Sequence, residues 1–346
     1  MKTEVISAIA QPEAGTGIGA DLIKAGQLVV FPTETVYGLG ANGLDGEAVN
    51  RIFAAKGRPN DNPLILHVSK KSEAKKLWGH VPELADKLMD TFWPGPLTLI
   101  FNRSSIVPDE VTAGLETVAV RMPANETARA LIRKSGVPIA APSANLSGKP
   151  SPTTAEHVLR DMDGRVPLIL DGGPCRFGVE STVLSLVGVP TILRPGAITK
   201  EMLEPVIGPV KLADCLLKPL REGEKVLSPG MKYRHYAPKA RVIVVNGDPK
   251  AVAERIQELY WRFEGEGHTC EIAATDQTAP AYKSCRFTLL GDRNDPITLC
   301  QSLFYSLREM DERADVILAE GIPTEGAGLA YMNRLLRAAG FETIEV

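Results

Sequence analysis

The segment KGRPNDNPLILHV, residues 56–68, places two cations in a loop directly before a short apolar run. Lys56 and Arg58 flank a glycine, and a proline follows them. The run LILHV, residues 64–68, comes after turn-forming residues and is rich in branched apolar side chains, so it predicts a buried strand. Two cations this close repel each other unless an anion lies between them. The segment therefore predicts a core strand of a sheet with an anion site beside it.

Short apolar runs of the same kind continue on both sides of this segment up to about residue 200. They predict strands at 28–31, 64–68, 97–101, 118–122, 138–141, 168–170, 182–187 and 191–193. Helical periodicity predicts helices near 18–25, 46–56, 82–91, 125–134 and 154–161. Asp45 is the expected N-terminal cap of the helix at 46–56. Because helices and strands do not alternate strictly, we expect an α/β fold with a twisted mixed sheet and flanking helices.

A proline-rich stretch, residues 206–240, separates this domain from a second one. Within 218–241, seven Lys or Arg and two Glu give a local net charge of +5, which is typical of a solvated linker. After it come strands at 241–246, 270–275, 286–291 and 316–322, alternating with helices at 249–263, 297–312 and 329–339. This order predicts a small parallel, Rossmann-like α/β domain over 241–346, following an N-terminal domain over 1–205.

The composition of the 346-residue chain limits the classes of partner. Its net charge of −3 gives no overall attraction to nucleic acid, so any anion site must be local. No apolar run approaches the ~20 residues that cross a bilayer, and the N-terminus lacks a signal-peptide core. We therefore expect a cytoplasmic protein with no membrane partner. The five cysteines include no C-x-x-C pair, which argues against a disulfide framework and a zinc site.

One glycine motif resembles a dinucleotide-binding loop but lies in the wrong context for one. Residues 38–43, GLGANG, fit G-x-G-x-x-G. In dinucleotide-binding domains these glycines follow the first strand directly and open a helix. Here PTETVY separates them from the strand, and no acidic residue ends a second strand about 20 residues further on. There is also no G-x-x-x-x-G-K-[ST] motif. The sequence therefore argues against both classes of nucleotide loop.

Two loops are unusually rich in polar groups. PTETVYGLG follows a predicted strand and holds Thr33, Glu34, Thr35 and Tyr37; loops at strand ends are where sheet proteins bind ligands, although turn chemistry alone also explains these residues. PSANLSGKPSPTT, residues 142–154, has hydroxyls and amides that suit a ribose or phosphate. It also suits a turn followed by a helix cap at residue 153 or 154.

Further cations lie at strand ends of the same domain. Arg121 is in the apolar run AVRMP, where a buried arginine needs a partner. Arg194 follows a strand before Pro-Gly, and ESTV places Ser181 at a strand entrance. Three arginines and a lysine near hydroxyls favour holding phosphates and carboxylates over attack by a side chain. Phosphoryl and nucleotidyl transfer need mainly positioning and charge neutralisation. The residues alone thus indicate a nucleotide or polyanion site with a divalent metal.

Seven segments in this order resemble the motifs of the YrdC-like domain: PTETVYGLG, KGRPNDNPLILHV, WPGPLTLIF, VAVRMP, PSANLSGKPSPT, ESTV and LRPGAI. SPGMKYRHYAP, residues 228–238, and the α/β domain after it resemble the long, two-domain members of that family, the threonylcarbamoyl-AMP synthases. The resemblance covers nearly the whole chain.

This resemblance implies a nucleotidyltransferase that uses L-threonine, bicarbonate and ATP and releases pyrophosphate. Mg²⁺ is expected to bind through the ATP phosphates, with no protein ligand assigned. The implied partners are the downstream tRNA threonylcarbamoyl transferase machinery, which modifies an adenosine beside the anticodon.

The resemblance also assigns residues, in three groups. The catalytic residues would be Lys56, Arg58, Ser143 and Asn145. The ATP contacts would be Arg58, Asn62, Thr117, Ser143, Ser151 and Arg194, with His235 or Tyr236 from a linker that closes over ATP. The L-threonine contacts would be Thr35, His67, Arg121, Ala141 and Ser181.

Two alternatives belong to other classes. Hydrogenase-maturation carbamoyltransferases share the domain but carry acylphosphatase-like and C-x-x-C zinc-finger segments, which this sequence lacks. A non-catalytic module that binds RNA weakly through a concave basic face is the second alternative, and salt-dependent affinity would reveal it.

Overall fold

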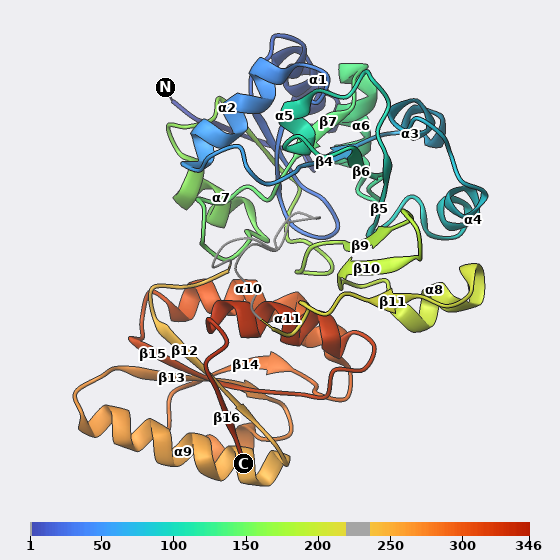
Figure 1. Ribbon diagram of the computed structural model, residues 1–346. Helices are drawn as coiled ribbons and strands as arrows, with labels where there is room; N and C mark the ends of the chain where they lie inside the picture. The colour runs from blue at the N-terminus through green and yellow to red at the C-terminus, as the bar shows by residue number, and fades with distance from the viewer. Residues whose placement is uncertain (1, 219–235) are drawn as a thin grey trace. The chain divides into compact units, whose positions relative to one another are not determined.

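The computed structural model describes residues 2–218 and 236–346 (Figure 1). Within these ranges, 2–147 and 151–216 form one compact unit, and 148–150, 217–218 and 236–346 form a second. Residues 219–235 of the predicted linker, His235 included, lie outside the described residues, so its closure over ATP stays a prediction.

A mixed sheet runs through the first unit, with the strand order β1-β8-β2-β3-β7-β4-β6-β5-β9-β10-β11. Parallel and antiparallel pairs both occur: β4 and β6 are parallel, whereas β5 and β6 are antiparallel. This confirms the predicted mixed α/β fold. The strand bounds are β1 Glu4–Ser7, β2 Val29–Phe31, β3 Gly38–Asn42, β4 Ile65–His67, β5 Leu97–Asn102, β6 Thr117–Arg121, β7 Ile139–Ala141, β8 Leu168–Asp171, β9 Thr182–Ser185, β10 Thr191–Arg194 and β11 Lys211–Leu212.

The segment leading into β2 shows why the middle of this sheet is buried on both faces. Successive strand side chains point to opposite faces. Val29 and Phe31 belong to the apolar cluster that includes residues of α1 (Pro12–Lys24) and α6 (Glu126–Ser135). Leu28 and Val30 belong to the cluster that includes residues of α2 (Gly46–Lys56) and α4 (Glu83–Phe92). A continuous apolar run, rather than an alternating one, is what such a strand requires.

Helix α2 positions the two cations of the opening segment. Asp45 caps its N-terminus by accepting hydrogen bonds from the backbone N–H groups of Glu47 and Ala48, at 3.0 and 3.2 Å, as predicted. Gly57 ends the helix in the left-handed conformation, with φ of 67°. Lys56 is therefore the last helical residue, and Arg58 begins the loop that leads to β4.

The glycines of residues 38–43 are explained by packing. Most of them lie in β3, which pairs with β2 on one side and β7 on the other. A Cβ atom at Gly40 would lie 2.8 Å from side-chain atoms of both Phe31 and Ile139. These glycines let bulky neighbours close over the strand, and they do not open a helix.

Several elements were absent from the sequence-based expectation. Strand β1, helix α3 (Lys71–Leu77), the short helix α5 (Asp109–Thr112) and helix α8 (Lys200–Ile207) are among them, and α1 begins at Pro12 rather than near residue 18. Helix α8 continues through Pro205, and β11 lies at residues 211–212, so regular structure extends past the predicted domain end at 205. Helix α7 (Ala155–Met162) was expected, and Thr154 is its cap.

The second unit is a five-stranded sheet with the order β14-β13-β15-β12-β16, and all its pairs are parallel. Figure 1 shows α9 on one face of this sheet and α10 and α11 on the other. This confirms the predicted Rossmann-like architecture. The bounds are β12 Arg241–Asn246, α9 Pro249–Gly265, β13 Cys270–Thr275, a 3₁₀ turn Ala279–Tyr282, β14 Phe287–Gly291, α10 Pro296–Met310, β15 Val316–Glu320, α11 Gly328–Ala338 and β16 Thr343–Glu345.

Within residues 2–218 and 236–346, no helix has both the length and the apolar character needed to cross a membrane. The five cysteines are all free thiols.

The left-handed Gly57 gives a stability prediction. Gly57→Ala should lower the free energy of unfolding of the first unit by about 1 kcal/mol, because a Cβ atom disfavours this conformation. Gly17→Ala, at a helical position with no atom within 4 Å of the added Cβ, is the matched control and should be neutral or stabilising. Urea unfolding followed by circular dichroism measures both, and equal effects would contradict the conformational argument.

Candidate functional site

Four of five neighbouring strands of the first unit carry polar side chains in one row. His67 on β4 pairs in register with Arg121 on β6, and Arg121 pairs with Thr98 on β5. Thr98 is opposite Val183 on β9, which pairs with Arg194 on β10. Adjacent strands lie about 4.8 Å apart, so this row brings together residues from four sequence motifs that are far apart along the chain.

Arg121 is the most tightly held member of the row. Its side chain is only 4% exposed. Its Nη2 group pairs with Glu34 Oε1 at 2.6 Å, Nη1 donates to Thr35 Oγ1 at 2.9 Å, and Nε donates to the Gly95 carbonyl at 3.2 Å. A guanidinium has five N–H groups, and these bonds use three of them. The guanidinium is therefore fixed in position and still has N–H groups that can donate to an anionic ligand.

The loop that supplies Glu34 and Thr35 is itself rigid. The Thr33 hydroxyl accepts hydrogen bonds from the backbone N–H groups of Thr35 and Val36, at 3.1 and 3.2 Å. The Tyr37 hydroxyl donates to the Gly173 carbonyl at 2.7 Å, and burial raises the pKa of Tyr37 above its usual value. The loop is therefore pinned at both ends, which sets the direction of the carboxylate between them.

Ser181 and Arg194 form the other end of the row. The Ser181 hydroxyl lies 2.8 Å from the Thr98 hydroxyl and accepts a bond from Arg194 Nη2 at 3.1 Å. Arg194 Nε donates to the Ser181 carbonyl at 3.0 Å. The structure thus brings a residue expected to contact threonine next to one expected to contact ATP.

His67 is neutral in this environment. Its burial and the nearby charge of Arg121 lower its pKa to about 3. Its Nδ1 atom is buried and has no hydrogen-bond partner among the described residues. An imidazole that stays unprotonated at neutral pH suits a hydrogen-bonding contact to a ligand, in line with the predicted threonine role, and gives no support to proton transfer.

Lys56 organises a loop and is not an open cation. Its Nζ donates to the carbonyls of Ser143 and Asn145, each at 2.6 Å. The Ser143 hydroxyl donates to Asn145 Oδ1, also at 2.6 Å. Three of the four predicted catalytic residues are therefore in direct contact.

The fourth predicted catalytic residue, Arg58, lies with its guanidinium carbon 5.3 Å from the centre of the Phe53 ring. An intervening anion is therefore not the only way to explain two cations as close as Lys56 and Arg58. Backbone carbonyls stabilise the charge of Lys56, and an aromatic ring contacts Arg58.

Asn62 is a buried amide without partners. Its side chain is fully buried, and among the described residues neither Nδ2 nor Oδ1 has a hydrogen bond. Ile65 pairs with Ala119 and with Ala141; continuing both registers by two residues places Thr117 and Ser143 level with Pro63, beside Asn62. Buried polar groups are nearly always satisfied, so this end of β4 and β6 is suited to a polar ligand.

The remaining predicted residues are placed as follows. Ser151 is fully buried and donates to Glu180 Oε1 at 2.5 Å. Ala141 ends β7 opposite Ile65. Tyr236 belongs to the second unit, where its ring centre is 4.9 Å from that of Phe304. Its role as an ATP contact stays a prediction.

Sequence reasoning missed the partners of the site residues: Glu34 as the partner of Arg121, Thr98 as that of Ser181, and Glu180 as that of Ser151. A signal existed for Glu34, because a buried arginine needs an acceptor and PTETVY has one carboxylate. Thr98 and Glu180 gave no such signal, since only the strand register brings them into contact.

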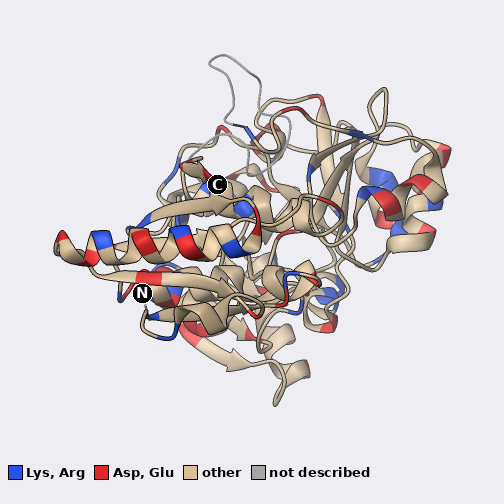
Figure 2. Cartoon of the chain, turned by 90° about the horizontal axis from the view of Figure 1, so that it is seen from below, with Lys and Arg blue, Asp and Glu red and all other residues tan. Residues whose placement is uncertain are grey.

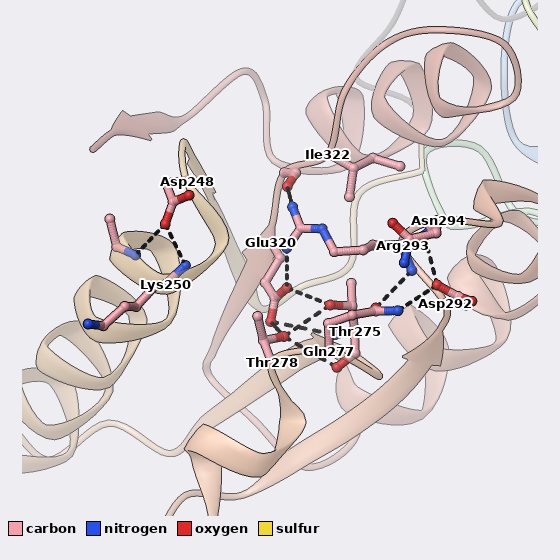
Figure 3. Close-up of polar contacts among 12 residues, drawn as sticks. Asp248, Lys250, Thr275, Gln277, Thr278, Asp292, Arg293, Asn294, Glu320 and Ile322 are labelled. Atoms are coloured by element: carbon pink, nitrogen blue, oxygen red, sulfur yellow. Dashed lines mark hydrogen bonds and ion pairs between the residues drawn. The ribbon is translucent and has the colours of Figure 1, made fainter.

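The second unit has a buried polar cluster of its own at the carboxyl ends of β13 and β15 (Figure 3). Glu320 is fully buried and accepts hydrogen bonds from the hydroxyls of Thr275 and Tyr282, each at 3.0 Å, and of Thr278. Arg293 Nη1 lies 3.8 Å from Glu320 Oε2. The three hydroxyls come from residues 275–282 and Arg293 from the loop after β14, so the carboxylate joins two segments at this edge of the sheet.

Comparison with known proteins covers both units. Residues 21–196 match a family model described as "Telomere recombination", and residues 198–340 match one described as "Threonylcarbamoyl-AMP synthase, C-terminal domain". A threonylcarbamoyl-AMP synthase of Bacillus subtilis is 50% identical over 94% of this chain and 93% of its own. One of Pyrococcus abyssi is 50% identical over 95% of each chain.

Solved structures agree with these sequence relatives. The crystal structure of Pyrococcus abyssi Sua5 complexed with L-threonine has a TM-score of 0.90 and 48% identity, and the match covers 96% of both chains. A variant of that protein with two alanine substitutions has a TM-score of 0.93 and 47% identity, covering 99% of this chain and 98% of its own.

The cluster around Glu320 predicts a loss of stability. Glu320→Gln replaces an acceptor oxygen with a donor group, so at least one buried hydroxyl loses its partner. The free energy of unfolding of the second unit should fall by about 1–3 kcal/mol. Glu325→Gln, at an exposed position, is the control. Chemical unfolding of both variants measures the difference, and an unchanged midpoint for Glu320→Gln would contradict it.

The pKa of His67 predicts how acid affects stability. It falls from 6.5 in the unfolded chain to about 3 in the fold, so between these values the unfolded chain binds a proton that the native state does not. The free energy of unfolding is therefore unaffected by His67 above pH 6.5. Below that pH it falls by roughly 1.4 kcal/mol per pH unit until the pH nears 3.

Urea midpoints of the first unit at pH 7.0, 6.0 and 5.0 test this expectation. His67→Gln should flatten the dependence, whereas substitution of the exposed His80 by Gln should not. The same slope in wild type and His67→Gln would show that other groups cause the acid sensitivity.

Proposed function

This chain belongs to the threonylcarbamoyl-AMP synthase family, and on that premise we propose that it makes threonylcarbamoyl-AMP and pyrophosphate from L-threonine, bicarbonate and ATP. The observation that supports this most directly is the buried Arg121, whose guanidinium is held by Glu34 and Thr35 but keeps donors for an anion. The related Sua5 protein of Pyrococcus abyssi forms a complex with L-threonine.

The geometry supports a site with two ends. Thr117 and Arg121 lie four residues apart on β6, which corresponds to roughly 13 Å along a strand. Arg121, His67 and Thr35 are suited to the threonine carboxylate and hydroxyl at one end. Asn62 and Ser143 lie level with Thr117 at the other end, where they suit the nucleotide. A substrate that joins an amino acid to a nucleotide spans such a distance.

The chemistry needs positioning more than a reactive side chain. Carboxylation of the threonine amine gives a carbamate anion, and attack of its oxygen on the α-phosphorus expels pyrophosphate. We assign Lys56 to holding Ser143 and Asn145 in place through two carbonyl contacts. Arg58, beyond the end of α2, would offset charge on the phosphates.

Mg²⁺ fits this scheme when it is bound by the phosphates of ATP. No group of three or more His, Cys, Asp or Glu suited to a metal occurs within residues 2–218 and 236–346, so the metal would be held through the phosphates. Bound there, it would neutralise phosphate charge.

The product is a reactive mixed anhydride, and we propose that tRNA threonylcarbamoyl transferase machinery consumes it in the cytoplasm. Weak RNA binding by this chain remains an alternative role. Figure 2 shows acidic and basic residues interspersed rather than separated by sign in that view.

Omission of single components tests the proposed reaction. The purified protein should release pyrophosphate from ATP and Mg²⁺ only when both L-threonine and bicarbonate are present, and mass spectrometry should detect threonylcarbamoyl-AMP. Asn62→Ala should raise KM for ATP about tenfold or more, because a buried amide that contacts the ligand contributes roughly 1–3 kcal/mol. Exposed Asn294→Ala is the control.

Release that ignores threonine would contradict the synthase proposal while keeping a nucleotide site. An unchanged KM for ATP in Asn62→Ala would instead remove Asn62 from that site. Stable exchange of pyrophosphate into ATP without threonine would indicate a covalent enzyme intermediate, which this proposal does not include.

A further inference from the structure

One carboxylate oxygen at the Arg121 clamp has no partner. Glu34 is 7% exposed, and its Oε1 atom pairs with Arg121 Nη2 at 2.6 Å. Its Oε2 atom is buried and has no hydrogen-bond donor within the described residues. A buried charged oxygen without a donor is costly, and a ligand that brings a donor would remove that cost.

The neighbouring donors are already committed elsewhere. The Thr35 hydroxyl contacts Arg121 and the Thr33 hydroxyl, at 2.9 and 2.8 Å. The Ser181 hydroxyl contacts Thr98 and Arg194. Burial raises the pKa of the Cys175 thiol, and the charge of Glu34 acts in the same direction. The thiol is therefore neutral and a weak hydrogen-bond donor.

We propose that Glu34 Oε2 accepts a hydrogen bond from the α-ammonium of the amino-acid substrate whose carboxylate binds Arg121. This inference rests on the proposed function and adds a specificity-determining residue to it. An amino-acid zwitterion has its two charges on neighbouring groups. The Glu34–Arg121 pair holds a carboxylate and a guanidinium side by side. The carboxylate can face the ammonium of the amino acid while the guanidinium faces its carboxylate.

The pair therefore reads both charges of an α-amino acid. A carboxylic acid without the amino group satisfies Arg121 but leaves Glu34 Oε2 buried and unpaired. The site then discriminates by the penalty of that unpaired charge in addition to the attraction of the ammonium. A Glu34 that only oriented Arg121 would affect every carboxylate ligand equally, so the two roles are separable by experiment.

The test compares two ligands that differ only in the ammonium group. Dissociation constants of L-threonine and (R)-3-hydroxybutanoate are measured by ligand-detected NMR on the full chain. Wild type should prefer L-threonine by at least about tenfold, the effect of one charge-assisted hydrogen bond. Glu34→Gln should weaken L-threonine about tenfold or more and change (R)-3-hydroxybutanoate by less than about threefold.

Two further variants serve as controls. Glu126→Gln removes the carboxylate of an exposed Glu–Arg pair in the same unit, the 2.8 Å pair with Arg129, and should leave the preference for L-threonine unchanged. Arg121→Ala should weaken both ligands, because they share the carboxylate. A thermal melt of each variant confirms that it is folded.

Equal weakening of both ligands by Glu34→Gln would overturn the inference and leave Glu34 as a positioning residue for Arg121. Unchanged L-threonine affinity would overturn it too, since Oε2 would then be satisfied by water. If Glu34→Gln does not fold, the wild-type ratio decides: equal affinity for the two ligands sinks the inference. Failure of wild type to bind L-threonine at all would instead contradict the proposed function.

Discussion

The site of the first unit depends on one ion pair that the fold buries. Burying a guanidinium on a central strand is unfavourable unless an acceptor is buried with it, and removing one partner of such a pair typically costs about 3–5 kcal/mol. Glu34 is that acceptor for Arg121. The pair therefore forces the loop between β2 and β3 against β6, although 87 residues separate the two side chains along the chain.

A second constraint extends this arrangement to the loop at residues 142–154. The ammonium of Lys56, at the C-terminus of α2, holds the carbonyls of Ser143 and Asn145. Because Asp45 and Gly57 fix the two ends of α2, the position of the loop follows from the position of the helix. The two contacts together explain how short sequence motifs form a single site: each motif supplies either a charge or the group that holds it.

The second unit follows a different logic. One of its buried carboxylates, Glu320, accepts hydrogen bonds from three hydroxyls of its own unit. This cluster ties loops together and has no orphaned carboxylate oxygen comparable to Glu34 Oε2. The two units therefore use a buried carboxylate differently: Glu320 accepts hydrogen bonds from neighbouring hydroxyls, whereas Glu34 holds the guanidinium of Arg121.

Patterns that act over a few residues were readable from the sequence. Apolar runs located most of the strands, Asp45 and Thr154 were recognisable as helix caps, and the two fold classes followed from the order of elements. The motif order pointed to the family. These features depend on periodicity, capping and turn chemistry, which are properties of neighbouring residues.

Only the tertiary structure decided which polar groups are partnered. The sequence indicated that Arg121 needs an acceptor, but strand order and register determine that Glu34 is that acceptor, that Thr98 meets Ser181, and that Lys56 contacts backbone carbonyls. The same applies to the glycines of residues 38–43, whose role is set by Phe31 and Ile139 on neighbouring strands. Pairing between distant segments depends on how the whole sheet closes, and no local pattern encodes that.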